Sequence, residues 1–172
     1  PQTILFDLKT EFNQYCDEKG EAEKDKFGLN CYHPQNYSGK FVGPVSMKDA
    51  LAQSLNIPAV KTLYLTVLDD VIALAKKMGI TTLNEKNRYG LSLTLGGGEI
   101  KLIELAQAYS VFANTGTKVS FSPVIKIVDS NGNVVEEHKP SSERVLSPSV
   151  ANMISNILSD NNARSPVFGE RS

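Results

Sequence analysis

From Ser46 onward, apolar residues recur at the three- and four-residue spacing of helices that bury one face. Five segments show this spacing. In the first, Ser46 and Asp49 resemble a capping box, and the helix stops at 54–56. The second begins at Pro58, and the last opens at Ser147-Pro148, where proline suits a first turn. The predicted apolar faces are Met47, Ala50 and Leu51; Val60, Leu63, Tyr64, Val67 and Leu68; Val71, Leu74, Ala75 and Met78; Leu102, Leu105, Ala106, Tyr109 and Ala113; and Val150, Ile154, Ile157 and Leu158.

The period changes to two residues between the fourth and fifth helices. Residues 124–128 and 134–136 flank the turn-forming segment Asp-Ser-Asn-Gly-Asn at 129–133, which predicts a β-hairpin. Residues 1–45 are rich in turn formers and predict a mostly irregular wrap over the surface. The pattern as a whole predicts an α+β fold in which helices dominate.

Composition narrows the class of protein. A chain of 172 residues with 41% hydrophobic and 22% charged residues is long enough for one domain, or part of one. The 18 basic and 19 acidic residues form no basic stripe, so nucleic acid is not expected as a partner. No apolar run approaches the roughly 18 residues of a membrane span. The chain opens directly on what resembles folded sequence, so we expect a segment of a longer protein.

The two cysteines, Cys16 and Cys31, flank a charged stretch. In an exported protein they could form a disulfide, and the alternative is two unpaired thiols. Zinc bound by Cys16, Cys31 and His33 is a third possibility, but the spacing matches no common finger and no fourth ligand is obvious. We therefore expect no metal and no other cofactor.

The segment Ala-Leu-Ala-Gln-Ser-Leu-Asn-Ile-Pro-Ala-Val-Lys at 50–61 interrupts a helical run at Ser54, Leu55 and Asn56. One reading is purely structural, with Ser54 ending one helix and Asn56 capping the next. Other phrases occur with this one in a fixed order. They are Pro34-Gln35-Asn36-Tyr37, Phe41 to Ser46, Leu95 to Glu99, Glu104 to Gly116, and Leu158 to Asn161 with Ala163-Arg164.

In order and spacing these phrases resemble the transpeptidase domain of class A penicillin-binding proteins, and most closely the branch typified by penicillin-binding protein 1C. The resemblance covers 3–169 and implies the penicillin-binding/serine β-lactamase-like fold, mainly its helical subdomain plus a β-hairpin. The family pattern also needs Ser-x-x-Lys before the triplet and Lys-Thr-Gly after it, and neither occurs in this sequence. We therefore expect residues 1–172 to be a partial transpeptidase domain, with the first element upstream and the second downstream.

The resemblance assigns roles to two residues. The Ser54 hydroxyl, which donates and accepts at once, would relay a proton between the absent Lys and the departing D-Ala amine. The Asn56 amide would donate to the substrate carbonyl while its oxygen orients the Lys ammonium. A D-Ala-D-Ala stem peptide would acylate the serine of Ser-x-x-Lys in the parent, as would β-lactams. The isolated 172 residues should be inactive.

The resemblance also implies peptidoglycan stem peptides and β-lactam antibiotics as partners, an extracytoplasmic location (periplasm or outer face of the inner membrane), and a parent anchored through a segment outside this chain. A glycosyltransferase domain in the parent is a further expectation. One rival is a non-catalytic scaffold or binding module of the envelope with the same fold. A more distant rival is a β-lactamase, which would release the acyl group rapidly.

Two phrases imitate catalytic motifs. Ser159-Asp160-Asn161 matches the Ser-Asp-Asn of class A β-lactamases, but we expect it to be a fraying helix end, because no helix is expected to follow it. Asn114-Thr115-Gly116-Thr117 imitates Lys-Thr-Gly-Thr without the cation and reads as a helix stop. Tyr109 and Phe112 are expected in the core.

Overall fold

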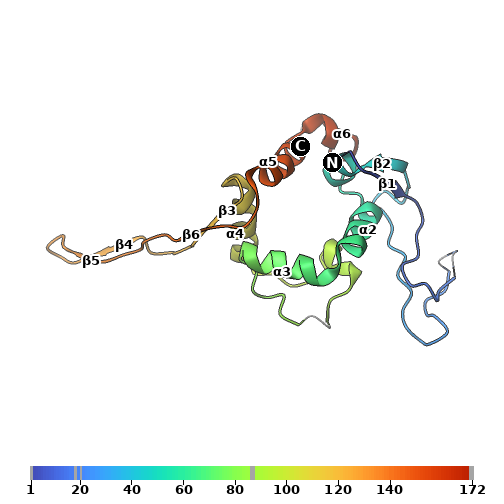
Figure 1. The fold of residues 1–172 in the computed structure, drawn as a ribbon, viewed down its shortest axis with the longest axis horizontal. Helices are drawn as coiled ribbons and strands as arrows, with labels where there is room; N and C mark the ends of the chain where they lie inside the picture. Colours follow the sequence, from blue (N-terminus) through green and yellow to red (C-terminus); the bar gives the residue numbers. More distant parts are fainter. Residues whose placement is uncertain (1, 18, 20, 86–87, 171–172) are drawn as a thin grey trace. The chain divides into compact units, whose positions relative to one another are not determined.

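The computed structural model describes residues 2–17, 19, 21–85 and 88–170. The chain forms two compact units. Figure 1 labels their helices and strands. The first unit comprises Pro1–Val71, Asn87–Gly98 and Asn156–Ser172, and the second comprises Ile72–Lys86 and Glu99–Ser155. Two helices, α3 (Leu68–Met78) and α5 (Pro148–Leu158), run from one unit into the other.

The first unit contains a two-stranded sheet that the sequence analysis did not predict. Strand β1 (Ile4–Asp7) pairs antiparallel with β2 (Gly43–Ser46), which places Leu5 opposite Val45. Leu5 and Asp7 are the buried residues of β1, in the alternation expected of a strand with one covered face. The expectation of a mostly irregular segment over 1–45 was therefore wrong at both of its ends.

Helices α1 (Met47–Ala52) and α2 (Asn56–Thr66) follow β2. The capping box is confirmed: Ser46 Oγ accepts from the backbone N–H of Asp49 at 3.0 Å and donates to Asp49 Oδ2 at 2.6 Å. Helix α2 begins at Asn56, two residues before the predicted start, and buries Ile57, Pro58, Val60 and Leu63. The 3-10 helix η2 (Leu91–Leu95) contacts α2.

Helix α6 (Asn161–Phe168) was also missed. Asp160 is its N-cap, and its Oδ1 accepts from the backbone N–H of Ala163 at 3.1 Å. The prediction that 159–161 is a fraying end was wrong, because the polar triplet begins a helix and does not merely end α5. Pro166 lies inside α6, a position where proline is unfavourable for a helix.

The second unit is built on α4 (Leu102–Ala113), which has the predicted bounds but a different buried face. Its core joins Ala108 and Val111 to Met78 and Ile80. Tyr109 is 58% exposed, so its predicted place in the core was wrong, whereas Phe112 packs against the core as expected. Leu102 is 83% exposed. The apolar face that residue spacing predicted for α4 therefore lies largely at the surface of this chain.

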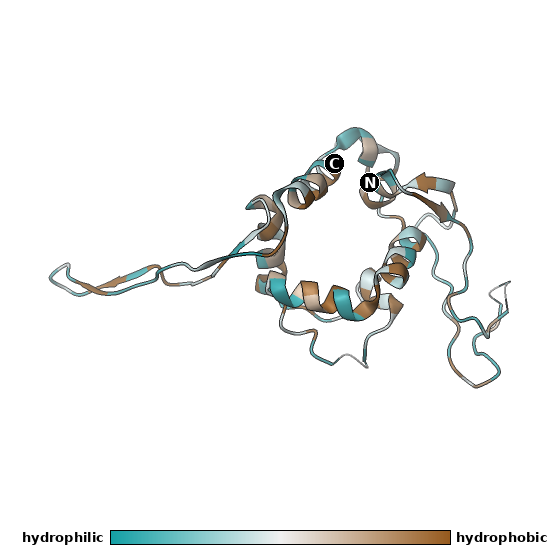
Figure 2. Cartoon of the chain, viewed as in Figure 1, coloured by the Kyte–Doolittle hydropathy of each residue, from teal (hydrophilic) through white to brown (hydrophobic). Residues whose placement is uncertain are grey.

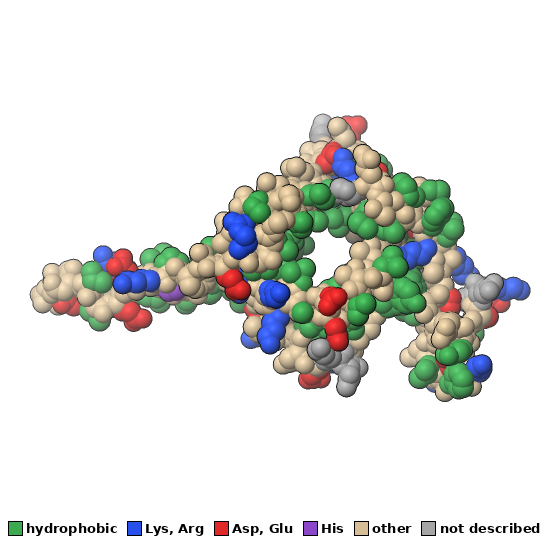
Figure 3. Space-filling view, in the orientation of Figure 1, with side chains coloured by type: hydrophobic (Ala, Val, Ile, Leu, Met, Phe, Trp, Pro, Cys, Tyr) green, Lys and Arg blue, Asp and Glu red, His purple; other side chains and the backbone are tan. Residues whose placement is uncertain are grey.

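Two small sheets complete the second unit. Strand β3 (Thr117–Val119) pairs with β6 (Ser142–Arg144), and β4 (Lys126–Val128) pairs with β5 (Val134–Glu137). The β4–β5 hairpin confirms the prediction from the two-residue period. Figure 3 shows apolar side chains at the surface of this hairpin, which include Ile127, Val128, Val134 and Val135.

The predicted third and fifth helices are present as α3 and α5, and Pro148 is the first residue of α5 as expected. Hydrophilic and hydrophobic residues alternate along α3 in Figure 2, and Ile72 and Met78 are its buried side chains. In α5, Ala151 and Ile157 are buried. Within the described residues, no helix combines the length and the apolar content needed to cross a membrane.

Candidate active site

Ser54 occupies a strained position at the end of α1. Its φ is +55°, in the left-handed region that favours glycine. The backbone N–H of Ser54 donates to Leu51 O at 3.1 Å, and that of Leu55 donates to Ala50 O at 3.0 Å. These two hydrogen bonds define a Schellman motif in which Ser54 holds the place usually taken by glycine. Its side chain is exposed and makes no hydrogen bond to the described part of the chain.

Asn56 is the first residue of α2, and the extended Leu55 is the N-cap. The alternative in which Asn56 caps α2 was therefore wrong. The Asn56 side chain instead donates from Nδ2 to the carbonyl of Gln35 at 2.7 Å. The left-handed Ser54 and the extended Leu55 turn the chain between the two helices, so the side chains at 54 and 56 reach one cleft instead of diverging as on a regular helix.

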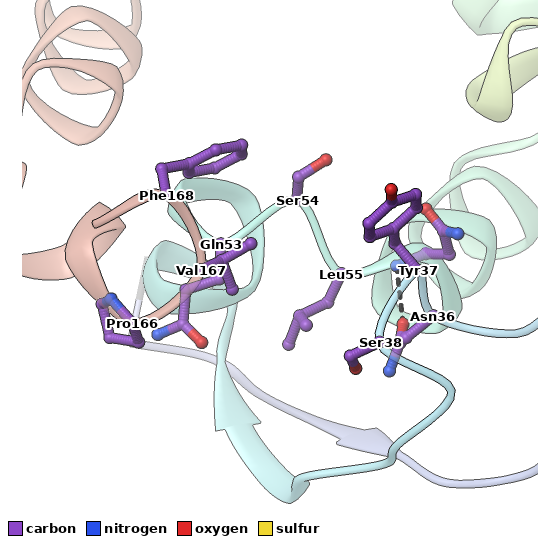
Figure 4. Close-up of a pocket in the computed structure, with 10 residues that line it drawn as sticks. Asn36, Tyr37, Ser38, Gln53, Ser54, Leu55, Pro166, Val167 and Phe168 are labelled. Atoms are coloured by element: carbon purple, nitrogen blue, oxygen red, sulfur yellow. Dashed lines mark hydrogen bonds between the residues drawn. The ribbon is translucent and has the colours of Figure 1, made fainter. Parts of the chain in front are cut away.

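A second polar residue supports this turn from outside it. Asn36 Oδ1 accepts from the backbone N–H of Asn56 at 2.9 Å, the dashed line in Figure 4. Asn36 Nδ2 in turn donates to both carboxylate oxygens of Asp7, at 2.9 and 2.8 Å. Lys61 of α2 donates to the carbonyl of Phe6. Burial lowers the pKa of the Lys61 ammonium, and the charge of Asp7 partly opposes this effect.

The turn opens into a cavity of about 690 Å³ that lies within the first unit. In Figure 4 the rings of Tyr37 and Phe168 lie on either side of Ser54; Tyr37 is fully exposed, and Phe168 is about half exposed. Such a cavity, with apolar walls and a few polar groups at one point, is typical of small-molecule and peptide sites. Its lining comprises Asn36, Tyr37, Ser38, Gln53, Ser54, Leu55, Asn56, Pro166, Val167 and Phe168.

Helix α6 supplies one wall of the cavity and is tied to α1. Lys48 Nζ lies 2.6 Å from Asp160 Oδ2. This hydrogen bond, followed by the one from the Ala163 N–H, holds the pKa of Asp160 below its usual value. The same hydrogen bond raises the pKa of Lys48. At the other end of α6, the Arg164 guanidinium lies over the Phe168 ring, 5.4 Å from its centroid.

Four residues of this site were not found by sequence reasoning: Asp7, Asn36, Asp160 and Phe168. Asp7 gave one usable signal, a charged residue at an inward position of an otherwise apolar four-residue strand. Asp160 gave another, since aspartate three residues before an alanine-containing run is a common N-cap. Nothing in the local sequence pointed Asn36 or Phe168 toward the turn.

The structure joins Cys16 and Cys31 in a disulfide with Cα atoms 5.9 Å apart. Both sulfurs are therefore engaged, and neither is a thiolate ligand for the zinc site considered with His33. Glu11 links the two arms of this loop, since its Oε1 accepts from the N–H groups of Asn13 and Tyr32. Burial works against ionisation, but these bonds and the His33 contact hold the pKa of Glu11 below its usual value.

The fold and this turn define a class of protein. The sequence profile described as penicillin binding protein transpeptidase domain matches residues 8–166. The chain belongs to this family, which confirms the family-level resemblance and the α+β fold read from the sequence.

Curated relatives agree. The chain is 42% identical over 113 residues to penicillin-binding protein 1A of Aquifex aeolicus, which covers 66% of this chain and 15% of that protein. It is 32% identical over 152 residues to penicillin-binding protein 2D of Bacillus subtilis, which covers 88% of this chain and 20% of that protein. The chain therefore spans about a fifth or less of the length of these relatives.

Solved structures show the same fold. Penicillin-binding protein 1A from Haemophilus influenzae superposes with a TM-score of 0.75 at 21% identity, covering 94% of this chain and 26% of that one. Penicillin-binding protein 3 from Mycobacterium tuberculosis, complexed with aztreonam, gives a TM-score of 0.63 at 18% identity, covering 81% of this chain and 34% of that one.

Proposed function

We propose that this chain forms part of a peptidoglycan D,D-transpeptidase that cross-links stem peptides through a serine acyl-enzyme. The observation that carries the proposal is the position of Ser54. If this residue only ended a helix, glycine would fit φ +55° without strain. Serine adopts this φ at a cost in conformational free energy, and a catalytic role for its hydroxyl would explain why serine is present. Family membership and the shared cavity of Ser54 and Asn56 support the same conclusion.

In this proposal the nucleophilic serine and its Lys lie on a Ser-x-x-Lys helix upstream of residue 1, and a Lys-Thr-Gly strand lies downstream of residue 172. The nucleophile attacks the D-Ala carbonyl and displaces D-Ala, and the acyl group then passes to an amine of a neighbouring strand. Ser54 relays the proton that the departing amine needs, and Asn56 donates to the substrate carbonyl. The 172 residues alone are inactive because they lack the nucleophile.

The proposal extends to partners and location. Stem peptides and β-lactams bind at the completed site, on the outer face of the inner membrane or in the periplasm, in a parent anchored through a segment outside this chain. The aztreonam complex of the Mycobacterium tuberculosis relative supports β-lactam binding. We retain the 1C-like branch as part of the proposal, on the order and spacing of the phrases between 34 and 164.

The test is a comparison of full-length protein with its Ser54→Ala and Asn56→Ala variants for acylation by a fluorescent penicillin. Loss of an oxyanion or proton-relay group is expected to slow acylation by about 100-fold or more. Unchanged acylation in both variants would favour a penicillin-binding-like scaffold in which these residues have no catalytic role. Rapid release of the label by the wild type would instead indicate a β-lactamase.

A further inference from the structure

Asp7 is a carboxylate with no exposed surface in the first unit. A buried carboxylate costs free energy unless hydrogen bonds satisfy its oxygens. Asp7 accepts two from Asn36 Nδ2 and one, at 2.9 Å, from the backbone N–H of Val42. An aliphatic side chain of similar volume would fill this buried position of β1 without a charge to desolvate, so packing alone does not account for the aspartate.

Asn36 transmits the orientation of this carboxylate to the candidate active site. Its side chain is 5% exposed, and its Nδ2 faces only acceptors: the Asp7 oxygens and the carbonyl of Lys40 at 2.9 Å. The amide oxygen is therefore forced to the opposite side, where it accepts from the N–H groups of Asn56 and Ile57. Both N–H groups belong to the first turn of α2, where the helix itself offers no acceptor, so Asn36 supplies the partner that they need.

Neighbouring atoms of the same loop hold the Asn56 side chain. The carbonyl oxygen of Gln35 accepts a hydrogen bond from Asn56 Nδ2, and the side-chain oxygen of Asn36 accepts one from the backbone N–H of Asn56. Residues 35 and 36 thus fix both the backbone and the amide of Asn56, two residues after the left-handed Ser54. Without these acceptors the start of α2 would lose the contacts that set its distance from Ser54.

We propose that Asp7 and Asn36 are positioning residues for acyl transfer, which act by fixing the Ser54–Asn56 turn. This inference rests on the function proposed above and deepens it. Neither residue touches the substrate. The Asp7 carboxylate fixes the orientation of the Asn36 amide, and the Asn36 oxygen fixes the Asn56 backbone.

The variant Asp7→Asn tests this chain of contacts at nearly constant volume. In this variant the side-chain NH₂ of residue 7 replaces one carboxylate oxygen and faces Nδ2 of Asn36, so two donors meet. Rotation of the Asn36 amide by about 180° relieves that contact but turns its Nδ2 toward the Asn56 N–H. Two donors then face each other at the start of α2. In full-length protein we expect the acylation rate constant for a fluorescent penicillin to fall about 10- to 100-fold, with a smaller change in the non-covalent binding constant.

The chain offers a matched control. Asn13 Nδ2 donates to Asp25 Oδ2 at 2.9 Å, and Asp25 is 8% exposed. Asp25 lies within the Cys16–Cys31 loop and Asn13 three residues before it, and neither lines the cavity. Asp25→Asn breaks a similar Asp–Asn contact and should leave the acylation rate constant at the wild-type value. Any general effect of losing such a pair on folding appears in both variants.

A rescue separates positioning from packing. The double variant Asp7→Asn with Asn36→Asp restores a complementary pair with its polarity reversed, a donor at 7 opposite an acceptor at 36, and the second carboxylate oxygen accepts from the Asn56 N–H. It leaves the Lys40 carbonyl without the donor that Asn36 supplies, so the rescue is partial: we expect an acylation rate constant at least about threefold above that of Asp7→Asn. If Asp7→Asn does not fold, Asn36→Asp is the reference instead, and a double variant no faster than its reference would overturn the inference.

Failure of the proposed transpeptidase function and failure of the positioning role of Asp7 and Asn36 give different results. Wild-type protein that is not acylated at all contradicts the proposed function itself. Wild-type protein that is acylated, with Asp7→Asn equal to Asp25→Asn in its rate constant, contradicts only the positioning role. A loss confined to the binding constant contradicts it as well.

Discussion

Lys48 and Asp160, 112 residues apart in the chain, meet with Nζ and Oδ2 2.6 Å from each other. The first residue lies in α1, and the second is the N-cap of α6. Because Ser54 follows the C-cap of α1 and Phe168 ends α6, this contact holds together two elements that lead into one cavity. Asp160 therefore has two roles, as a helix cap and as an ion-pair partner.

The two roles of Asp160 can be separated by pH. Its pKa in the folded protein is below the usual 3.8, chiefly because of Lys48, so its stabilising contribution is complete above about pH 4. The contribution is lost as the pH falls through the lowered pKa. Asp160→Asn keeps a good N-cap but removes the charge, so it is less stable than the wild type at pH 6.

The free energy of unfolding, measured with urea from pH 6 to pH 2.5, tests this prediction. We expect the difference between wild type and Asp160→Asn to shrink below pH 4. The raised pKa of Lys48 predicts a second loss as the pH rises above 10.5. A difference that stays constant across the acid range would contradict the ion-pair role of Asp160.

Ser54→Gly should separate stability from activity. Glycine relieves the left-handed strain but is more flexible when unfolded, so we expect a free energy of unfolding unchanged or raised by about 1 kcal/mol. Acylation by penicillin should be slowed as in Ser54→Ala. Thr115→Gly is the matched control, because Thr115 is exposed and has φ +52° in the second unit.

Urea unfolding and penicillin labelling of both glycine variants provide the measurements. Thr115→Gly should match Ser54→Gly in stability and the wild type in labelling. Labelling retained by Ser54→Gly would show that the hydroxyl has no part in the reaction.

Reduction of the Cys16–Cys31 disulfide should destabilise the protein. The bond closes a loop with a sequence separation of 15, for which a stabilisation of about 3 kcal/mol is expected. Thermal melting with and without a reductant measures the effect, and the Cys16→Ser/Cys31→Ser variant should melt like reduced wild type in both conditions. Two titratable thiols in protein isolated without reductant would contradict the pairing.

Gly116→Ala should be strongly destabilising. Gly116 has φ +92°, and an added Cβ would lie 2.2 Å from the carbonyl oxygen of Leu146. Gly132 in the hairpin turn also has a positive φ, +83°, but open space around it. Gly132→Ala should therefore cost about 1 kcal/mol, the backbone term alone, and Gly116→Ala at least about twice that. Equal midpoints in urea would contradict the close approach.

Much of the helical framework was predictable because its signals are local. The capping hydroxyl of Ser46, the turn at 129–133 and Pro148 each act on residues within a few positions. The β1–β2 pair was not predictable in this way, since the paired residues Leu5 and Val45 lie far apart in the sequence. Spacing likewise could not choose between the two apolar faces of α4, because burial depends on neighbours distant in sequence.

In the candidate site, too, the residues of a local motif were predictable and those that act through distant contacts were not. Ser54 and Asn56 were found as a short motif, and the structure places both on one cavity. Their supports come from distant parts of the sequence: Asn36 contacts Asn56 across 20 positions, and Asp7 contacts Asn36 across 29. Asn36 lay within a phrase already matched to the family, but its role depends on a buried carboxylate that only the folded chain brings to it.

The central claim is that this turn completes an active site whose nucleophile lies outside residues 1–172. Its most direct test is to label the full-length protein with a penicillin, digest it, and map the adduct by mass spectrometry. We expect one acylated serine, within a Ser-x-x-Lys sequence upstream of residue 1, and slow labelling of that serine in Ser54→Ala. An adduct on Ser54 or elsewhere within these 172 residues, or no adduct at all, would contradict it.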